Sequence, residues 1–203
     1  MDNQLNLREH RKALINILQM AFSGEKAAAL AYAGHWRAAR DPQEKIDIWK
    51  IEQEEWEHRA IVGEMLKELQ SAPLSWREAL MSTIGSIIFL GCFVGGWIFP
   101  MYVAGLLENS NVDEYKEAAK HASALGMNSD ANELMRLSAI ELRHEEFFKA
   151  KVCDHPWTKF LIPIFHWGSS NREPVKSDLA SANNEKLNPL FEELNDLRTS
   201  AVK

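Results

Sequence analysis

The chain has 203 residues, of which 46% are hydrophobic and 26% are charged, and its formal net charge is −6. This length suits one main domain with a sizeable core, and the composition indicates neither a disordered chain nor a polytopic membrane protein. The acidic balance disfavours a nucleic-acid partner, because nucleic-acid binding depends on clustered Lys and Arg and the sequence has no basic stripe.

Cysteine usage and the N-terminal sequence both bear on the compartment. The two cysteines, Cys92 and Cys153, are too few for a disulfide framework, which favours a reducing, cytosol-facing compartment. The first fourteen residues contain no uninterrupted apolar stretch before a small-residue cleavage site, so we expect no secretion or import signal.

Two helices are predicted in the first third of the chain. Apolar residues recur at helical spacing from residue 5 to residue 40, where Asp41 and Pro42 supply a turn and a helix start. A second helix is expected to run to about residue 70 and to end before Pro73, because the residue before a proline disfavours helical backbone.

The middle of the chain is apolar but interrupted. The sequence Ser-Trp-Arg-Glu at 75–78 matches a capping box and predicts a helix start at Ser75. No charged residue occurs between Met81 and Leu107, yet glycines and Pro100 interrupt this stretch, so we do not expect one straight helix through it. Helix is expected again from about residue 101 to residue 125.

A further helix is predicted after a break at residues 126–128, with Ser129 or Asp130 as its cap. The apolar and aromatic residues 156–167 are expected to form an interfacial helix at the C-terminal end of a domain that spans residues 1–167. Residues 168–203 are predicted to be a polar, partly disordered extension with a short helix at 188–198. No β-hairpin signal occurs, so the predicted fold class is all-α.

Two Glu-x-x-His pairs lie on the apolar faces of predicted helices. Glu55 and His58 form one pair, and Glu141 and His144 form the other. Side chains three residues apart on a helix are neighbours, so both members of a pair can reach one metal ion. Buried carboxylates are costly without a compensating charge, so their position among apolar residues favours a metal site over a structural role.

Single glutamates interrupt the apolar faces of the other two long helices. Glu25 lies 30 residues before Glu55, and Glu108 lies 33 residues before Glu141, so the chain contains two similar halves. The second half is less symmetric about its turn, and we expect a bulge or a break near residues 109–111.

Four carboxylates and two neutral imidazoles balance the charge of two divalent cations. Their mixed oxygen and nitrogen atoms suit iron or manganese, and the absence of cysteine from these six residues excludes a zinc finger. One Glu from each of two helices and Glu-x-x-His from two others is the arrangement of di-iron carboxylate bundles, which predicts a ferritin-like four-helix bundle. The predicted metal ligands are Glu25, Glu55, His58, Glu108, Glu141 and His144.

Other polar residues are interpreted as structural. His35 and His121 are expected to be core histidines with satisfied hydrogen bonds. Glu52, Glu54 and Glu57 are expected to form a solvated helix face, with Glu52 close enough to the apolar face to contact a ligand.

Short motifs surround the predicted ligands: Gly24 precedes Glu25 and Tyr-Ala-Gly follows at 32–34, Glu-Gln-Glu at 52–54 leads into Glu55, Val-Ala at 103–104 precedes Glu108, and Leu142 follows Glu141. Over residues 14–167 these motifs, and the glycine-rich apolar segment between them, resemble the demethoxyubiquinone hydroxylase family of di-iron monooxygenases. The resemblance implies a flattened bundle docked on a bilayer, where a polyprenyl benzoquinol is hydroxylated with O2. Two positions depart from the family pattern: Lys26 replaces an aromatic residue, and Glu114 stands where the family often has a histidine that helps electrons reach the iron.

We therefore expect a di-iron monooxygenase of ubiquinone biosynthesis with two iron ions as cofactor, O2 as co-substrate and an external reductant. The expected partners are a polyprenyl quinol and the surface of a membrane, with the protein peripheral to the cytoplasmic face of the cell membrane. Association into a homo-oligomer or a quinone-biosynthesis complex stays open.

Two other functions remain alternatives at this point. A ferritin-like protein that handles iron or detoxifies peroxide would use all six ligands, but it would not need the long uncharged segment. A non-enzymatic adaptor at a membrane would keep these carboxylates only as vestiges. Hydroxylation of a tRNA base is disfavoured by the acidic balance.

Overall fold

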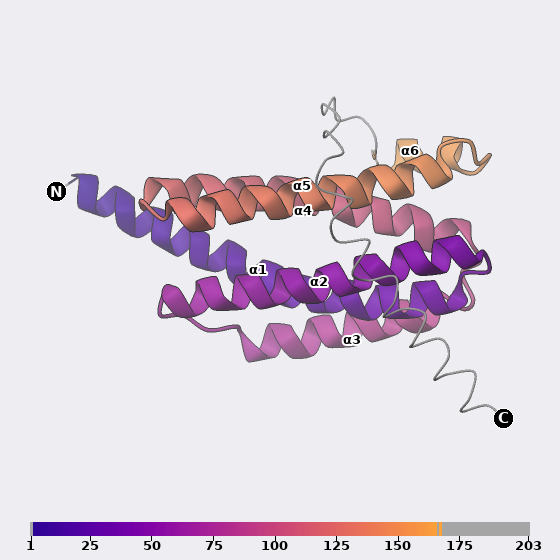
Figure 1. Cartoon of the computed structure of the whole chain (residues 1–203), viewed down its shortest axis with the longest axis horizontal. Helices are drawn as coiled ribbons and strands as arrows, with labels where there is room; N and C mark the ends of the chain where they lie inside the picture. Colours follow the sequence, from indigo (N-terminus) through magenta and orange to yellow (C-terminus); the bar gives the residue numbers. More distant parts are fainter. Residues whose placement is uncertain (1, 166, 168–203) are drawn as a thin grey trace.

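The computed structural model describes residues 2–165 and Trp167, and the regular structure within them is helical throughout (Figure 1). This confirms the predicted all-α class. The extension predicted at residues 168–203, with its short helix, lies outside the described residues. The helices are α1 (Asp2–Ala38), α2 (Pro42–Glu68), α3 (Ser75–Gly91), α4 (Ile98–Ala124), α5 (Asn128–Val152) and α6 (Thr158–Phe165).

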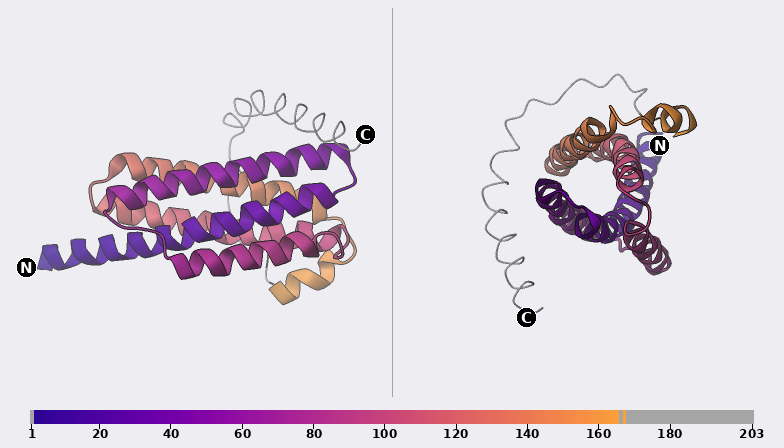
Figure 2. Two further views of the ribbon diagram at one scale, coloured as in Figure 1. Left: turned by 90° about the horizontal axis from the view of Figure 1, so that it is seen from below. Right: turned by 90° about the vertical axis from the view of Figure 1, so that its right-hand side faces the viewer.

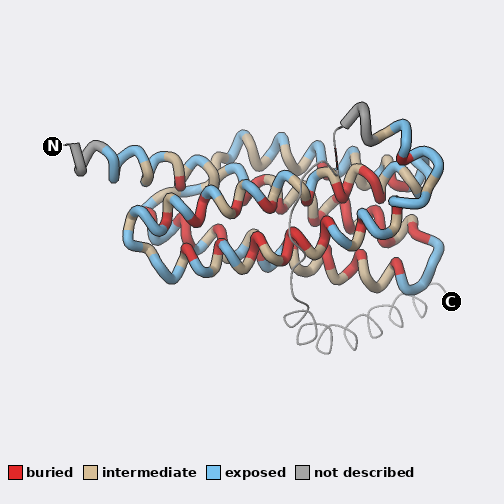
Figure 3. The backbone as a smooth tube through the Cα atoms, turned by 90° about the horizontal axis from the view of Figure 1, so that it is seen from above, coloured by how far each residue is buried: buried red, intermediate tan, exposed pale blue. Residues whose placement is uncertain are grey.

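Four long helices form a bundle, which is seen end-on in the right-hand view of Figure 2. Helix α1 packs against α2 and α4, and α5 packs against α4 and α2, so the four helices enclose a common interior. Their buried residues lie along the inward faces, while the first turns of α1 project beyond the other helices (Figure 3). The predicted helical spacing of apolar residues therefore places one face of each long helix in the core.

Helices α3 and α6 lie outside this bundle, on the same side of it in both views of Figure 2. Helix α3 packs closely on α1, because glycines occur where the two backbones meet. A Cβ atom on Gly34 would lie 2.5 Å from the carbonyl oxygen of Phe89, and one on Gly85 would lie 2.7 Å from that of Ala27. Within the described residues, no helix combines the length and the apolar character needed to cross a bilayer.

The break predicted within the apolar stretch is confirmed at residues 92–97, between α3 and α4. Gly96 has a φ of +69°, a backbone conformation that other residues rarely adopt. Helix begins again at Ile98, and Pro100 is tolerated there because the first turn of a helix needs no intrahelical partner for its N–H groups.

Two predicted helix caps are wrong. Ser75 is the first residue of α3 and makes no capping bond, since Leu74 occupies the cap position. The nearby Glu78 instead pairs with Arg59 of α2 at 2.6 Å, which links α3 to the bundle. The start of α5 likewise has no side-chain cap, because its cap position falls on Met127, ahead of Ser129 and Asp130.

Two apolar clusters fill the bundle, one toward each end. On α2, Ile48 and Ile51 belong to one cluster and Val62 belongs to the other. On α5, Leu137 belongs to one and Phe148 to the other. The residues between the clusters on these helices include the Glu-x-x-His pairs, so a polar layer crosses the middle of an otherwise apolar core.

Candidate metal centre

The six predicted ligands come together in this polar layer, and each is at most 4% exposed. They form two overlapping groups, and within each group the candidate ligand atoms all lie within 4.8 Å of one another. Glu55 and Glu141 belong to both groups, so each of these carboxylates could help to hold a metal ion at either group. The first group is Glu25, Glu55, His58 and Glu141, and the second is Glu55, Glu108, Glu141 and His144.

The helices place these residues without the predicted distortion of α4, which runs as an unbroken α-helix through residues 109–111. Glu108 lies 18 residues before Gly126 and Glu141 lies 15 after it. The offset of three residues corresponds to about 4.5 Å of helix rise, which the length of the two side chains spans. Instead of marking a break, Asn111 points into the site, where its amide donates to Glu141 at 3.4 Å and to Glu108 at 3.5 Å.

Several buried polar atoms in this layer have no hydrogen bond among the described residues. They include both carboxylate oxygens of Glu55, both ring nitrogens of His58 and Nδ1 of His144. His58 Nδ1 comes within 2.8 Å of Glu141 Oε1, but without the direction of a hydrogen bond. Each such atom costs about 1–3 kcal/mol when it is left unsatisfied, so a bound cation would remove a large penalty. The donor set therefore fits metal ions.

Burial and mutual repulsion suppress ionisation of the carboxyl groups in the absence of a cation. Burial, followed by the charge of Glu141, raises the pKa values of Glu55 and Glu108 well above their ordinary range. Burial and the charge of Glu25 raise the pKa of Glu141 to about 8, against the lowering effect of hydrogen bonds with Glu108 and Asn111. The metal-free layer thus holds protons that divalent cations would displace.

Two buried tyrosines orient the carboxylates of α1 and α4. The hydroxyl of Tyr32 donates a hydrogen bond to Glu108, and that of Tyr115 donates to Glu25. Burial and the neighbouring carboxylates raise the pKa values of both hydroxyls, so both remain donors. Such outer hydrogen bonds fix the orientation of a ligand and hence the geometry of the metal site.

Glu54 orients His144 in the same way, although the sequence interpretation placed Glu54 on a solvated face. Its carboxylate lies 2.6 Å from Nε2 of His144, which leaves Nδ1 directed toward Glu55 at 3.3 Å. Burial opposes ionisation of Glu54, but the hydrogen bond and charge of His144 outweigh this effect and lower the pKa of Glu54 to about 2. The missed signal was its spacing, three residues after Ile51 and four before His58 on the inward face.

The other two glutamates of that interpretation differ from each other. Glu52 accepts a hydrogen bond from the Trp36 indole at 2.6 Å and has a raised pKa because it is largely buried. Glu57 is half exposed and pairs with Arg136 at 3.2 Å, as expected for a surface residue.

Carboxylate oxygens and imidazole nitrogens at two adjoining positions are suited to a pair of divalent iron or manganese ions. Of the two cysteines, Cys92 is buried away from this layer and Cys153 is exposed, so neither adds a thiolate. Comparisons with protein-family models, with curated proteins and with solved structures found no match for this chain.

We predict that the metal-free protein loses stability as the pH rises from about 5 to 8. Because the pKa of Glu141 is raised from 4.5 to about 8, the folded chain holds a proton in this range that the unfolded chain has released. Thermal unfolding of chelator-treated protein, followed by circular dichroism, should show a falling midpoint. The Glu141→Gln variant, which cannot ionise, should show a shallower fall, and a midpoint that rises with pH would contradict the prediction.

We also predict that Glu54→Ala weakens binding of Fe(II) by about 10–100-fold, because the ring of His144 loses its orienting partner. Glu57→Ala is the matched control, since Glu57 lies on the same helix and pairs with the surface residue Arg136. Competition with a chromogenic chelator under anaerobic conditions measures both affinities. Glu54→Gln, which can still hydrogen-bond the imidazole, should lose less than Glu54→Ala. Equal losses in Glu54→Ala and Glu57→Ala would exclude the orienting role.

Proposed function

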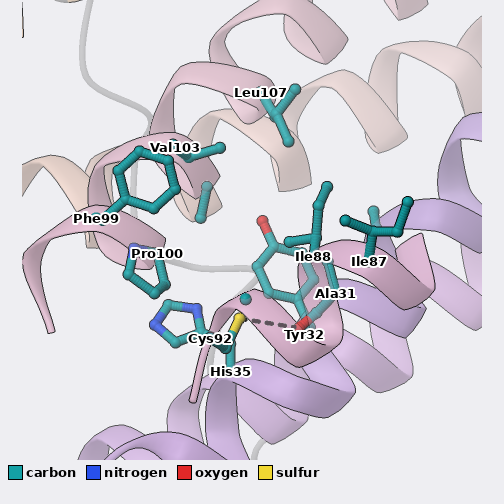
Figure 4. Close-up of a pocket in the computed structure, with 13 residues that line it drawn as sticks. Ala31, Tyr32, His35, Ile87, Ile88, Cys92, Phe99, Pro100, Val103 and Leu107 are labelled. Atoms are coloured by element: carbon teal, nitrogen blue, oxygen red, sulfur yellow. Dashed lines mark hydrogen bonds between the residues drawn. The ribbon is translucent and has the colours of Figure 1, made fainter. Parts of the chain in front are cut away.

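We propose that the chain is a ferritin-like di-iron monooxygenase that hydroxylates a membrane-borne polyprenyl benzoquinol of the demethoxyubiquinol type, as its sequence resemblance implies. The observation that carries this proposal is an apolar cavity beside the polar layer. It has a volume of about 270 Å³ and lies between α1, α3 and α4 (Figure 4). Tyr32 forms part of its wall and contacts Glu108, so the cavity adjoins the candidate metal centre.

A second cavity of about 230 Å³ continues the first along the same helices and shares Ala28, Ile88 and Leu107 with it. Its wall includes Glu25 and Tyr115, so this cavity reaches the polar layer directly. A protein that only stores or oxidises iron has no need of an apolar chamber next to its metals. The two cavities therefore favour an organic substrate over the iron-handling alternative.

Iron ions at this centre would supply the reduction of O2 and the insertion of one of its oxygen atoms into the substrate, with two electrons and two protons from outside converting the other to water. The chain itself supplies position and enclosure. Aliphatic side chains line the cavity and exclude water from an ordered substrate. Tyr32 lies between the substrate space and Glu108 and keeps that carboxylate oriented.

An exposed apolar surface surrounds the mouth of the cavity. Ile87, Phe99 and Leu107 line the cavity and are also exposed to solvent. Leu90 is 66% exposed on α3, and Phe160 is 70% exposed on α6, a helix on the same side of the bundle. Apolar areas of this kind mark contacts with membranes or with proteins. We assign this surface to peripheral attachment at the cytoplasmic face of the cell membrane, which would let a polyprenyl quinol enter from the lipid.

The reaction is tested by expressing the chain in a bacterial strain that accumulates demethoxyubiquinone and identifying the extracted quinones. We expect conversion of the accumulated quinone, and about two iron atoms per chain after anaerobic reconstitution. Glu55→Ala and His58→Ala should abolish conversion and lose most of the iron, because they remove ligands of the proposed centre. Two bound iron atoms without any conversion of the quinone would exclude this substrate and support the iron-handling alternative.

We predict that Leu90→Asp and Phe160→Asp each reduce sedimentation with anionic phospholipid vesicles severalfold while the iron content is unchanged. A charge on this surface opposes its burial among acyl chains. Met135→Asp is the matched control, because Met135 is 48% exposed on the bundle helix α5. In the alternative, a second copy of the chain or another enzyme of a quinone-biosynthesis complex covers this surface. Sedimentation velocity without lipid measures the oligomeric state and so distinguishes self-association from attachment to a membrane. Wild-type protein that ignores vesicles would exclude the membrane assignment.

A further inference from the structure

His35 is a buried histidine that the metal centre does not use. Its side chain is in the wall of the apolar cavity described above, and also in the wall of an adjoining cavity of about 400 Å³ that reaches Arg40 and Trp97. Only 5% of the residue is exposed, and its ring makes no hydrogen bond among the described residues. This differs from the sequence interpretation, in which His35 was expected to be a satisfied core histidine.

Few polar side chains line the apolar cavity, and the others are already engaged. The hydroxyl of Tyr32 donates to Glu108, and the thiol of Cys92 is directed at the carbonyl oxygen of Ala31 at 3.8 Å. Figure 4 shows the imidazole of His35 between Cys92 and Pro100, at the edge of the space that the apolar side chains enclose. Among the described residues that line this cavity, His35 therefore offers a side chain without a hydrogen-bond partner.

The position of His35 relative to the metal centre is also defined. The rings of Tyr32, Phe148 and His35 lie nearly parallel, with centroids 5.7 Å apart between Tyr32 and Phe148 and 6.0 Å apart between His35 and Phe148. The Tyr32 and His35 ring centroids are 6.5 Å apart. His35 and Tyr32 thus line the same cavity, and Tyr32 also contacts Glu108, so the cavity connects His35 with the candidate metal centre.

We propose that His35 is a substrate-binding residue, whose imidazole hydrogen-bonds a carbonyl or hydroxyl oxygen of an apolar ring compound and so fixes which ring atom faces the metal centre. This inference rests on the proposed function only for the use of the cavity as the substrate site. Burial lowers the pKa of His35 to about 4, so the ring is neutral near pH 7. A neutral imidazole has one donor and one acceptor nitrogen, so it can bind either a quinone carbonyl or a quinol hydroxyl.

The test compares two tetramethyl ring compounds of similar shape, one with two carbonyl oxygens and the other, an aromatic hydrocarbon, with hydrogen atoms in their place. Duroquinone carries four methyl groups and two carbonyl oxygens, and durene carries the same methyl groups on a ring without oxygen. The four methyl groups also leave no open ring position for addition of the Cys92 thiol. Binding of each compound to the full-length chain is measured by calorimetry at pH 7, which requires no turnover.

Wild-type protein should bind duroquinone more tightly than durene, and His35→Leu should weaken duroquinone binding about tenfold while durene binding is unchanged. His35→Gln, which keeps a donor and an acceptor, should restore most of the affinity for duroquinone. His121→Leu is the matched control, because His121 lies on α4 away from the cavity and contacts His10. Unchanged duroquinone binding in His35→Leu, or an equal loss for both compounds, would overturn the proposal.

A second measurement uses only wild-type protein, so its result does not depend on whether the variants fold. In wild-type protein with 15N-labelled histidine, duroquinone should shift the ring nitrogen signals of His35 far more than durene does, and equal shifts would contradict the hydrogen bond. The result also separates the two proposals. If wild-type protein prefers duroquinone through His35 but the strain that accumulates demethoxyubiquinone shows no hydroxylation, only the proposed reaction is excluded. If hydroxylation occurs but His35→Leu keeps its full affinity for duroquinone, only the role of His35 is excluded.

Discussion

The burial of four carboxyl groups in one layer of the bundle is the constraint on which the rest of the structure depends. Glu25, Glu55, Glu108 and Glu141 lie between two apolar clusters, and the other members of the two candidate groups are His58 and His144. Such a layer is stable only when protons or cations neutralise it. The raised pKa values show that protons neutralise the carboxylates when no cation is bound. The buried carboxylate and imidazole atoms without hydrogen bonds could instead bind cations. Binding of a metal ion in this layer would therefore be coupled to folding.

Most of this layer was predictable because its signal is periodic. A Glu or His that replaces an apolar residue at an inward position is visible in the sequence. The similar separations of Glu25 from Glu55 and of Glu108 from Glu141 also indicate which residues face each other within each helical hairpin. Helix order, the Asp41-Pro42 turn and the break before α4 follow from equally local signals. The bulge expected near residues 109–111 is wrong. It was predicted so that Glu108 and Glu141 would lie at the same height along the bundle, but long glutamate side chains can span a difference of three residues in height.

The residues that were missed depend on contacts between elements, which one helix pattern does not contain. Glu54 borders the inward face of α2, and its partner His144 comes from α5, so only the packing of the bundle identifies the pair. Glu78 looked like a capping residue because of its spacing from Ser75, but tertiary contact with Arg59 outweighed that local bond. His35 appeared to be an ordinary core histidine, and its cavity exists only because α3 lies across α1 and α4.

The two sides of the polar layer are unequal, and this asymmetry sets the direction of access. Helices α2 and α5 each contribute two of the predicted ligands, and Glu54 and the Arg136–Glu57 pair close that side with polar contacts. Helices α1 and α4 contribute one glutamate each, and the three cavities described above lie along them. Because α3 approaches α1 closely at Gly34 and Gly85, aliphatic side chains of α3 cover the apolar cavity. A substrate would therefore approach from the side with fewer predicted ligands, where the cavities and the apolar surface lie, and His58 and His144 would lie on the opposite side.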